Sequence, residues 1–289
     1  MNISRREFAA MALAIPAYRI IDPHVHVWKV DAKYPWAKET KNPPKEDASA
    51  EMLLDLMKAN GVARTVLVQV IHYRWDNSYT ADVLKKYPME FVGVARVNPL
   101  DPASPDHVTK LVSEQHFQGV RLSPSADASG DWIRGELMPP LWKRCLDEKA
   151  VMQILAPVTR MPDIAALCEK FPDLTVVIDH MADCPIDRPQ DLEKLIALKR
   201  YPKVFVKISH TWSISKQPYP FLDAQEYAKR LVAAYGTHRI MWGTDWPIVE
   251  QHCGYAKALT VVKDEMKFLT EEDKKWILGG TVERVFKFR

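Results

Sequence analysis

Short apolar runs recur along the chain, and a segment with helical spacing follows almost every one of them. Each run is continuous in hydrophobicity and bounded by glycine, proline or polar residues, which is typical of a strand buried on both faces. The predicted strands cover 18–21, 66–70, 91–95, 119–122, 151–155, 175–179, 204–208 and 239–242. The predicted helices cover 49–60, 80–87, 105–115, 137–149, 162–170, 190–199, 224–235, 255–267 and 271–278. This alternation indicates βα units and a parallel sheet.

About eight strands separated by helices, in a chain of 289 residues, match the period and length of an α/β protein with a (β/α)₈ TIM barrel. An open, doubly wound sheet is the alternative architecture. It would usually carry a glycine-rich phosphate loop, and the pattern Gly-x-Gly-x-x-Gly does not occur in the sequence. No linker or change in composition divides the chain, so we predict one domain over 18–289 after a leader over 1–17.

The predicted leader resembles a twin-arginine export signal. Arg5 and Arg6 lie in the charged start 4–8, and the short apolar segment 9–17 follows. Such a signal predicts export to the periplasm. The alternative is a capped N-terminal helix in a cytoplasmic protein.

Charge and composition narrow the classes of partner. The net charge of +3 comes from 40 basic and 37 acidic residues spread over the whole chain, so the sequence has no basic block for nucleic acid. No apolar run approaches the roughly 20 residues that a membrane helix needs. The four cysteines form no Cys-x-x-Cys pair, and we expect buried free thiols. The expected partner is a small-molecule substrate, and the composition is compatible with a homo-oligomer.

Titratable residues stand at the ends of three predicted strands. His24 and His26 follow the first strand and would share one face about 7 Å apart, because side chains alternate along an extended segment. His180 comes directly after the sixth strand, and Asp245 follows the eighth. In a barrel all strand ends meet in one mouth, so these four side chains would converge. Imidazoles and a carboxylate could bind a divalent metal or activate water opposite a polarised carbonyl. The alternative for His24 and His26 is a strand with two ordinary, hydrogen-bonded histidines.

Further residues of the predicted mouth could contact a substrate. Arg121 and Gln153 lie on the fourth and fifth strands, His72 and His210 follow strands, and Trp246 could form a stacking wall. The planar guanidinium of Arg121 would suit a substrate carboxylate or hydroxyl, whereas an internal ion pair is the alternative. A tryptophan is more often simply buried.

Three motifs in this order resemble the amidohydrolase superfamily, and in particular its amidohydrolase-related branch, which contains sugar lactonases and pyrone-dicarboxylate lactonases. The motifs are His24-Val25-His26, Val177-Ile178-Asp179-His180 and Trp242-Gly243-Thr244-Asp245-Trp246-Pro247. The resemblance extends over 20–286, and the Gly-Thr-Asp-Trp-Pro part is its most specific element.

The resemblance implies a metal-dependent type of TIM-barrel hydrolase in which Asp245 activates water for attack on a carbonyl. His24, His26 and His180, with Asp245, would hold a metal, or the histidines would polarise the carbonyl directly. Metal-rich members carry a histidine on the fifth strand and a bridging lysine on the fourth, where this chain has Gln153 and Arg121. We therefore expect one zinc or other divalent metal, or a metal-independent site. His210 stands where relatives commonly have glycine, which would narrow the mouth.

A lactone is the substrate that this set of residues suits best, because a cyclic ester has a tolerable leaving group and an amide demands stronger electrophilic help. A decarboxylase or hydratase with a single zinc on the same barrel is the second hypothesis. The third is a binding protein that kept the fold without its chemistry.

Overall fold

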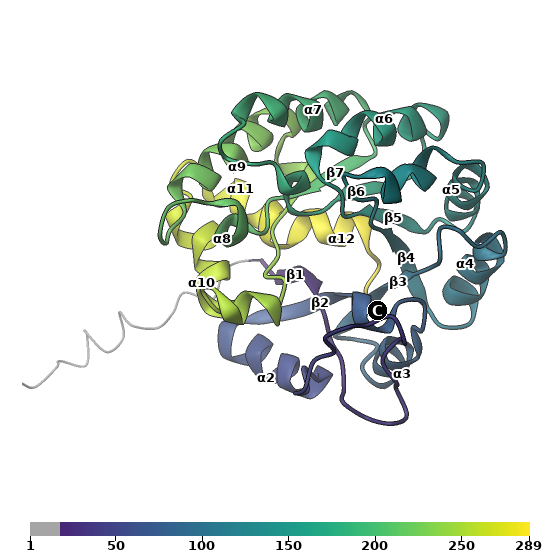
Figure 1. Cartoon of the computed structure of the whole chain (residues 1–289). Coiled ribbons are helices and arrows are strands. Elements are labelled where there is room, and N and C mark those ends of the chain that lie inside the picture. The colour runs from purple at the N-terminus through teal and green to yellow at the C-terminus, as the bar shows by residue number, and fades with distance from the viewer. Residues whose placement is uncertain (1–17) are drawn as a thin grey trace, which may run out of the picture.

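The computed structural model describes residues 18–289, so the predicted leader lies outside the described residues. Eight strands form one parallel sheet in the sequential order β1 to β8, and helices surround them (Figure 1). The strands are β1 (Ile20–Val25), β2 (Val62–Val68), β3 (Phe91–Arg96), β4 (Phe117–Leu122), β5 (Val151–Ile154), β6 (Val176–Ile178), β7 (Val204–Lys207) and β8 (Ile240–Met241). The barrel prediction is confirmed, and the open doubly wound sheet is excluded.

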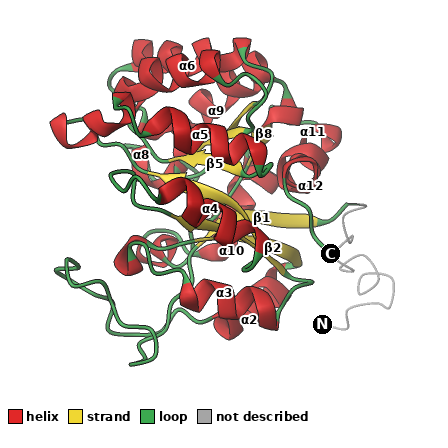
Figure 2. Cartoon of the chain, turned by 90° about the vertical axis from the view of Figure 1, so that its right-hand side faces the viewer, coloured by secondary structure: helices red, strands yellow, loops and turns green. Residues whose placement is uncertain are grey.

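Eleven α-helices lie in this part of the chain, mostly between consecutive strands (Figure 2). They are α2 (Ala50–Asn60), α3 (Ser78–Lys86), α4 (Ser104–Ser113), α5 (Met138–Asp147), α6 (Met161–Lys170), α7 (Leu192–Ile196), α8 (Thr211–Ile214), α9 (Leu222–Tyr235), α10 (Tyr255–Thr260) and α11 (Glu271–Lys275), and α12 (Thr281–Val285) follows them. Gly61, at φ 68°, ends α2 in the left-handed conformation that glycine adopts without strain, as its position predicts. The predicted helix 190–199 is divided into α7 and flanking 3₁₀ turns, and α8 and α12 are too short for periodicity to predict.

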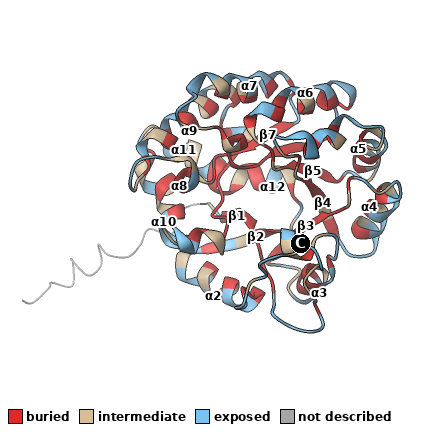
Figure 3. Cartoon of the chain, in the orientation of Figure 1, coloured by how far each residue is buried: buried red, intermediate tan, exposed pale blue. Residues whose placement is uncertain are grey.

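The strands are almost entirely buried (Figure 3). Alternate residues of each strand face opposite sides of the barrel wall. The residues that point into the barrel form a separate apolar group, the inner cluster, which includes Val66, Val68, Val94 and Phe205. The alternate residues of the same strands, such as Leu67 and Ala95, pack outward against the helices. Phe286, after α12, joins the inner cluster and is fully buried. The C-terminal segment therefore covers the N-terminal ends of the strands and leaves the opposite end for a site.

The barrel closes through the segments that carry the predicted site residues. The backbone N–H of His26 donates to the Trp246 carbonyl at 2.7 Å, and that of Asp245 donates to the His24 carbonyl at 2.9 Å. The carboxylate of Asp22 in β1 accepts from the hydroxyl of Thr244 at 2.6 Å. These contacts fix the end of β1 beside the chain that follows β8.

The composition predicts that no helix crosses a membrane and that the cysteines are buried free thiols. No helix within 18–289 is both long and apolar enough to span a bilayer. Cys145, Cys168 and Cys184 are buried free thiols as predicted, while Cys253 is partly exposed.

Candidate active site

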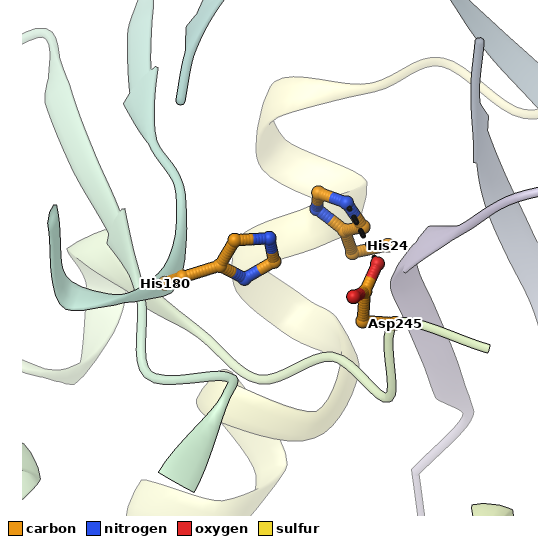
Figure 4. A group of neighbouring side chains, drawn as sticks. All are labelled: His24, His180 and Asp245. Carbon is orange, nitrogen blue, oxygen red and sulfur yellow. Dashed lines mark ion pairs between the residues drawn. The ribbon is translucent and has the colours of Figure 1, made fainter. Parts of the chain in front are cut away.

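Two imidazoles and one carboxylate meet at the C-terminal end of the barrel. His24 comes from β1, His180 follows β6 and Asp245 follows β8, and one ligand atom of each lies within 4.8 Å of the others. All three are buried, and His180 faces the pair formed by His24 and Asp245 (Figure 4). The predicted convergence of these three side chains is therefore present in the structure.

Lys207 and Asp179 contact one ring nitrogen of His24, and its other nitrogen faces Asp245. Its Nδ1 lies 3.1 Å from Lys207 Nζ and 3.3 Å from Asp179 Oδ1, and its Nε2 lies 3.4 Å from Asp245 Oδ1. Burial, together with the charge of Lys207, lowers the pKa of His24 to about 3. The imidazole is therefore neutral at neutral pH and can offer a lone pair.

His26 is oriented by the backbone of the next strand. Its Nδ1 lies 2.7 Å from the Val68 carbonyl, which can only accept a hydrogen bond, so the ring proton belongs on Nδ1. Its Nε2 is then a lone pair that faces Asp245 Oδ1 at 3.1 Å. Two acceptors at this distance require a proton or a cation between them.

Asp245 is ionised and strongly hydrogen-bonded on one oxygen. His210 Nε2 donates to Asp245 Oδ2 at 2.6 Å. Burial acts to raise the pKa of Asp245, but the hydrogen bond from His210 opposes it, and the pKa is held well below its usual range. Burial likewise opposes protonation of His210, but Asp183 and Asp245 raise its pKa to about 9. His210 and Asp245 thus form a buried ion pair.

His180 completes the group as a neutral ligand. Its Nδ1 lies 2.8 Å from Ser209 Oγ, and its ring stacks on that of His210 at 3.5 Å between centroids. Burial, followed by the charge of His210, holds the pKa of His180 well below its usual value.

The residues fit a divalent cation. His24 Nε2 and Asp245 Oδ1 are buried and have no hydrogen-bond partner within 18–289. Two neutral imidazoles and one carboxylate are a donor set that zinc accepts, with a position left for water or substrate. His26 lies beside this group, on the same carboxylate oxygen, but outside the three residues that converge most closely.

A buried cluster of charged residues around Asp179 supports the site. Asp179 Oδ2 accepts from Arg121 Nε at 2.9 Å and from Gln153 Nε2 at 3.0 Å, while Oδ1 lies 3.1 Å from Lys207 Nζ. Burial acts to raise the pKa of Asp179, but Lys207, His24 and Arg121 keep it well below the usual range. Arg121 therefore forms an internal ion pair, which was the alternative to a contact with the substrate. Gln153 positions the same carboxylate.

A sequence model described as amidohydrolase matches residues 21–288. The chain belongs to the amidohydrolase family. The L-fucono-1,5-lactonase of Burkholderia ambifaria is 27% identical over 234 residues, which cover 79% of this chain and 80% of that protein. The 4-sulfomuconolactone hydrolase of Hydrogenophaga intermedia is 29% identical over 241 residues, covering 81% and 75% of the two chains.

Solved structures share the fold of this amidohydrolase. An amidohydrolase of Burkholderia multivorans with bound zinc superposes with a TM-score of 0.78 at 20% identity, covering 94% of this chain and all of that one. A 5-carboxyvanillate decarboxylase of Sphingomonas paucimobilis gives a TM-score of 0.69 at 16% identity, with coverage of 94% and 100%. At these identities the likeness concerns the fold alone.

The other predicted contacts of this amidohydrolase lie near the site in different ways. His72 is half-buried, its ring is 6.1 Å from that of Trp28, and burial, followed by the charge of His26, lowers its pKa. Trp246 is only 3% exposed and packs in the main core, so its carbonyl rather than its ring supports the site through His26. Substrate contacts by His72, His210 and Trp246 stay predictions.

Sequence reasoning assigned no role to the supporting residues Asp179, Lys207 and Ser209. Lys207 left a signal, because a lysine inside the apolar run 204–208 must be paired when that strand is buried. Asp179 carries a similar signal at the end of β6. Their partners lie on other strands, so only the folded chain identifies them.

We expect His210→Gly to move the acid limb of the pH profile of kcat/KM to higher pH. The variant loses the hydrogen bond that lowers the pKa of Asp245, and a base with a higher pKa is protonated at higher pH. His210 has φ 63°, a conformation that suits glycine, so the backbone should tolerate the change. Activity measured between pH 4 and 10 tests this, with His252→Ala as control. An unchanged acid limb would show that His210 does not act on Asp245.

Proposed function

We propose that the protein hydrolyses a lactone, with Asp245 as the base that activates water. The observation that carries the proposal is the oxygen Asp245 Oδ1, which is buried, has no hydrogen-bond partner within 18–289, and lies 3.1 Å and 3.4 Å from Nε2 of His26 and His24. The names of the related lactone hydrolases support the same reaction.

The geometry assigns a step to each residue. Asp245 accepts a proton from water, the water oxygen bonds to the lactone carbonyl carbon, and the bond to the ring oxygen then breaks. Asp245 returns the proton to the departing alkoxide, so the product is an open hydroxy acid. His210 holds Asp245 in place through Oδ2 and leaves Oδ1 for the water.

A divalent metal is part of the proposal. Asp245 has a low pKa and is a weak base, and the lone pair that His26 presents cannot donate a hydrogen bond to a carbonyl. A metal bound by His24, His180 and Asp245 would lower the pKa of water to about 7 and polarise the carbonyl. The donor set makes zinc the first candidate.

We expect the purified protein to contain about one zinc per chain, and His180→Asn to lower this content at least about tenfold, as loss of a ligand does. Elemental analysis after dialysis measures both, with His107→Asn on the surface helix α4 as control. Full activity with less than about a tenth of a metal per chain would contradict the metal proposal.

Proton release on a panel of sugar lactones, γ-lactones and pyrones tests the function. We expect base uptake equal to the hydroxy acid formed, with at least one lactone turned over and no carbon dioxide. Carbon dioxide released from an aromatic carboxylate, with no lactone hydrolysed, would instead establish the decarboxylase alternative.

Export through the twin-arginine signal stays a prediction. It rests on Arg5 and Arg6, which lie outside the part of the chain that the structure describes. The homo-oligomer likewise stays a prediction.

A further inference from the structure

Arg96 ends β3 on the inside of the barrel, at the level of the site. It follows Val92 and Val94 at the spacing of inward-facing residues, and both valines belong to the inner cluster. Its Cα is paired with that of Arg121 on β4. The side chain is only 4% exposed, so two arginines lie next to each other in the wall of the mouth.

The two arginines differ in their partners. Arg121 has Asp179 at 2.9 Å, whereas no carboxylate within 18–289 lies within ion-pair distance of Arg96. Arg96 Nη1 donates to Ser123 Oγ at 3.1 Å, and Nε has no hydrogen-bond partner in the described part of the chain. Burying a guanidinium without an anion is costly, so this arrangement calls for an acceptor.

Arg160 is a second buried arginine, and unlike Arg96 it is paired with carboxylates. It is 5% exposed and has Asp131 at 3.0 Å and Asp163 at 3.2 Å. Its Nε and Nη2 donate to backbone carbonyls as well. Arg96 has no comparable set of acceptors among residues 18–289.

Arg96 is nevertheless held in a defined position. The amide of Asn77 bonds both backbone groups of Arg96, at 2.9 Å and 3.0 Å, and the Trp75 ring lies 5.7 Å from its guanidinium carbon. Burial, followed by the charges of Arg121 and Arg74, lowers the pKa of Arg96 to about 9, so it stays a cation at neutral pH.

A cavity lies beside Arg96 on the side of α3 and α4. Arg96 lines a cavity of about 390 Å³ together with Trp75, Asn77 and Lys110. Asp76 and Asp101 line the same cavity, whereas Ser123, His24, His180 and Asp245 do not. A carboxylate would therefore bind on the other side of Arg96, inside the barrel, where Ser123 lies. Ser123 Oγ accepts from Arg96, which leaves its own proton free for a ligand.

We propose that Arg96 and Ser123 bind a carboxylate of the substrate, so that the lactone opened at Asp245 carries an anionic group. The planar guanidinium and the serine hydroxyl would each donate to that carboxylate. Arg96 is then a residue that determines specificity, and the substrate is a lactone carboxylate rather than a neutral sugar lactone. This inference rests on the proposed lactonase function.

The first test compares γ-butyrolactone with 5-oxotetrahydrofuran-3-carboxylate, which adds only a carboxylate. We expect Arg96→Gln to lower kcat/KM for the charged lactone about 10- to 100-fold, mainly through KM, because a hydrogen bond to a charged group contributes this much. Turnover of the neutral lactone should change less than about threefold. Ser123→Ala should act in the same direction with a smaller effect. Equal losses on both lactones would overturn the proposal.

The second test needs no turnover and therefore separates this inference from the proposed function. Calorimetric titration with isophthalate, a planar dicarboxylate that cannot be hydrolysed, should give at least about tenfold weaker binding to Arg96→Gln than to the wild type. Lys29→Gln, which removes an exposed charge after β1, is the matched control and should bind isophthalate as the wild type does. Equal affinities of wild type and Arg96→Gln would overturn the proposal whatever lactones are hydrolysed.

The melting temperature distinguishes a binding role from a structural one. Because Arg96 is buried without a carboxylate partner within 18–289, Arg96→Gln should melt at the wild-type temperature or above it. A marked fall in melting temperature together with weaker binding would assign Arg96 to the fold and not to the substrate.

Discussion

Asp245→Asn is expected to lower kcat/KM at least about 10³-fold, because it removes the only general base that the proposed reaction uses. An amide cannot take the proton from water, and it is a weaker ligand for a divalent metal. Initial rates with any lactone that the wild type hydrolyses measure the effect. The fold should persist, since an amide oxygen can still accept the hydrogen bond from His210 and the backbone bond to His24 is unchanged.

Asp183→Asn is the matched control for this variant. Asp183 Oδ1 lies 3.8 Å from the other nitrogen of His210, and Asp183 is not one of the three converging side chains. We expect its kcat/KM to stay within about fivefold of wild type, since a partly exposed ion pair at 3.8 Å contributes little. Wild-type activity in Asp245→Asn, or an equal loss in both variants, would exclude Asp245 as the base.

The sequence was sufficient to predict the barrel and the converging residues. Hydrophobic runs at regular intervals predict the strands, and the rule that chemistry lies at the C-terminal strand ends brings His24, His180 and Asp245 together. Those predictions need only the order of the elements. His26 is in the same place but turns its lone pair to Asp245 because the Val68 carbonyl fixes its ring, and this contact crosses between strands.

The roles of the arginines could not be predicted in the same way. Arg121 and Arg96 stand at equivalent positions on neighbouring strands, and the sequence alone favoured Arg121 as the substrate contact. The difference arises from Asp179 on β6, which reaches Arg121 and leaves Arg96 without a carboxylate within 18–289. His210 was expected to narrow the mouth, but its stacking on His180 and its bond to Asp245 depend on a left-handed backbone conformation that a sequence does not display.

Asp179→Asn is expected to have the largest effect on stability. The carboxylate is fully buried and contacts Arg121, Lys207 and His24, so its removal leaves buried positive charges without compensation. Breaking a buried pair in this way costs about 3–5 kcal/mol. For a domain of this size the melting temperature should fall by about 6–20 °C. Asp82→Asn, which breaks an exposed pair with Lys33, should cost less than about 1 kcal/mol and is the control.

The pH dependence gives this prediction a second readout. The pKa of Asp179 is lowered by folding, so its contribution to stability is present above the unfolded pKa of 3.8 and is lost as the pH falls below that value. The difference in melting temperature between wild type and Asp179→Asn should therefore be constant near neutral pH and shrink in acid. A difference that grew as the pH fell would contradict the assignment of an ionised Asp179.

Removing one of the uncompensated cations should partly restore the variant. Arg121 and Lys207 are the two cations that contact Asp179. Adding Lys207→Met to Asp179→Asn removes one of them, so the double variant should lose less stability than the sum of the two single losses. Denaturant unfolding of the four proteins in the cycle measures the coupling. If the two losses of unfolding free energy simply add, then the charge of Lys207 is not compensated by Asp179. In that case Asp179 would be held beside His24 by its bonds to Arg121 and Gln153 alone.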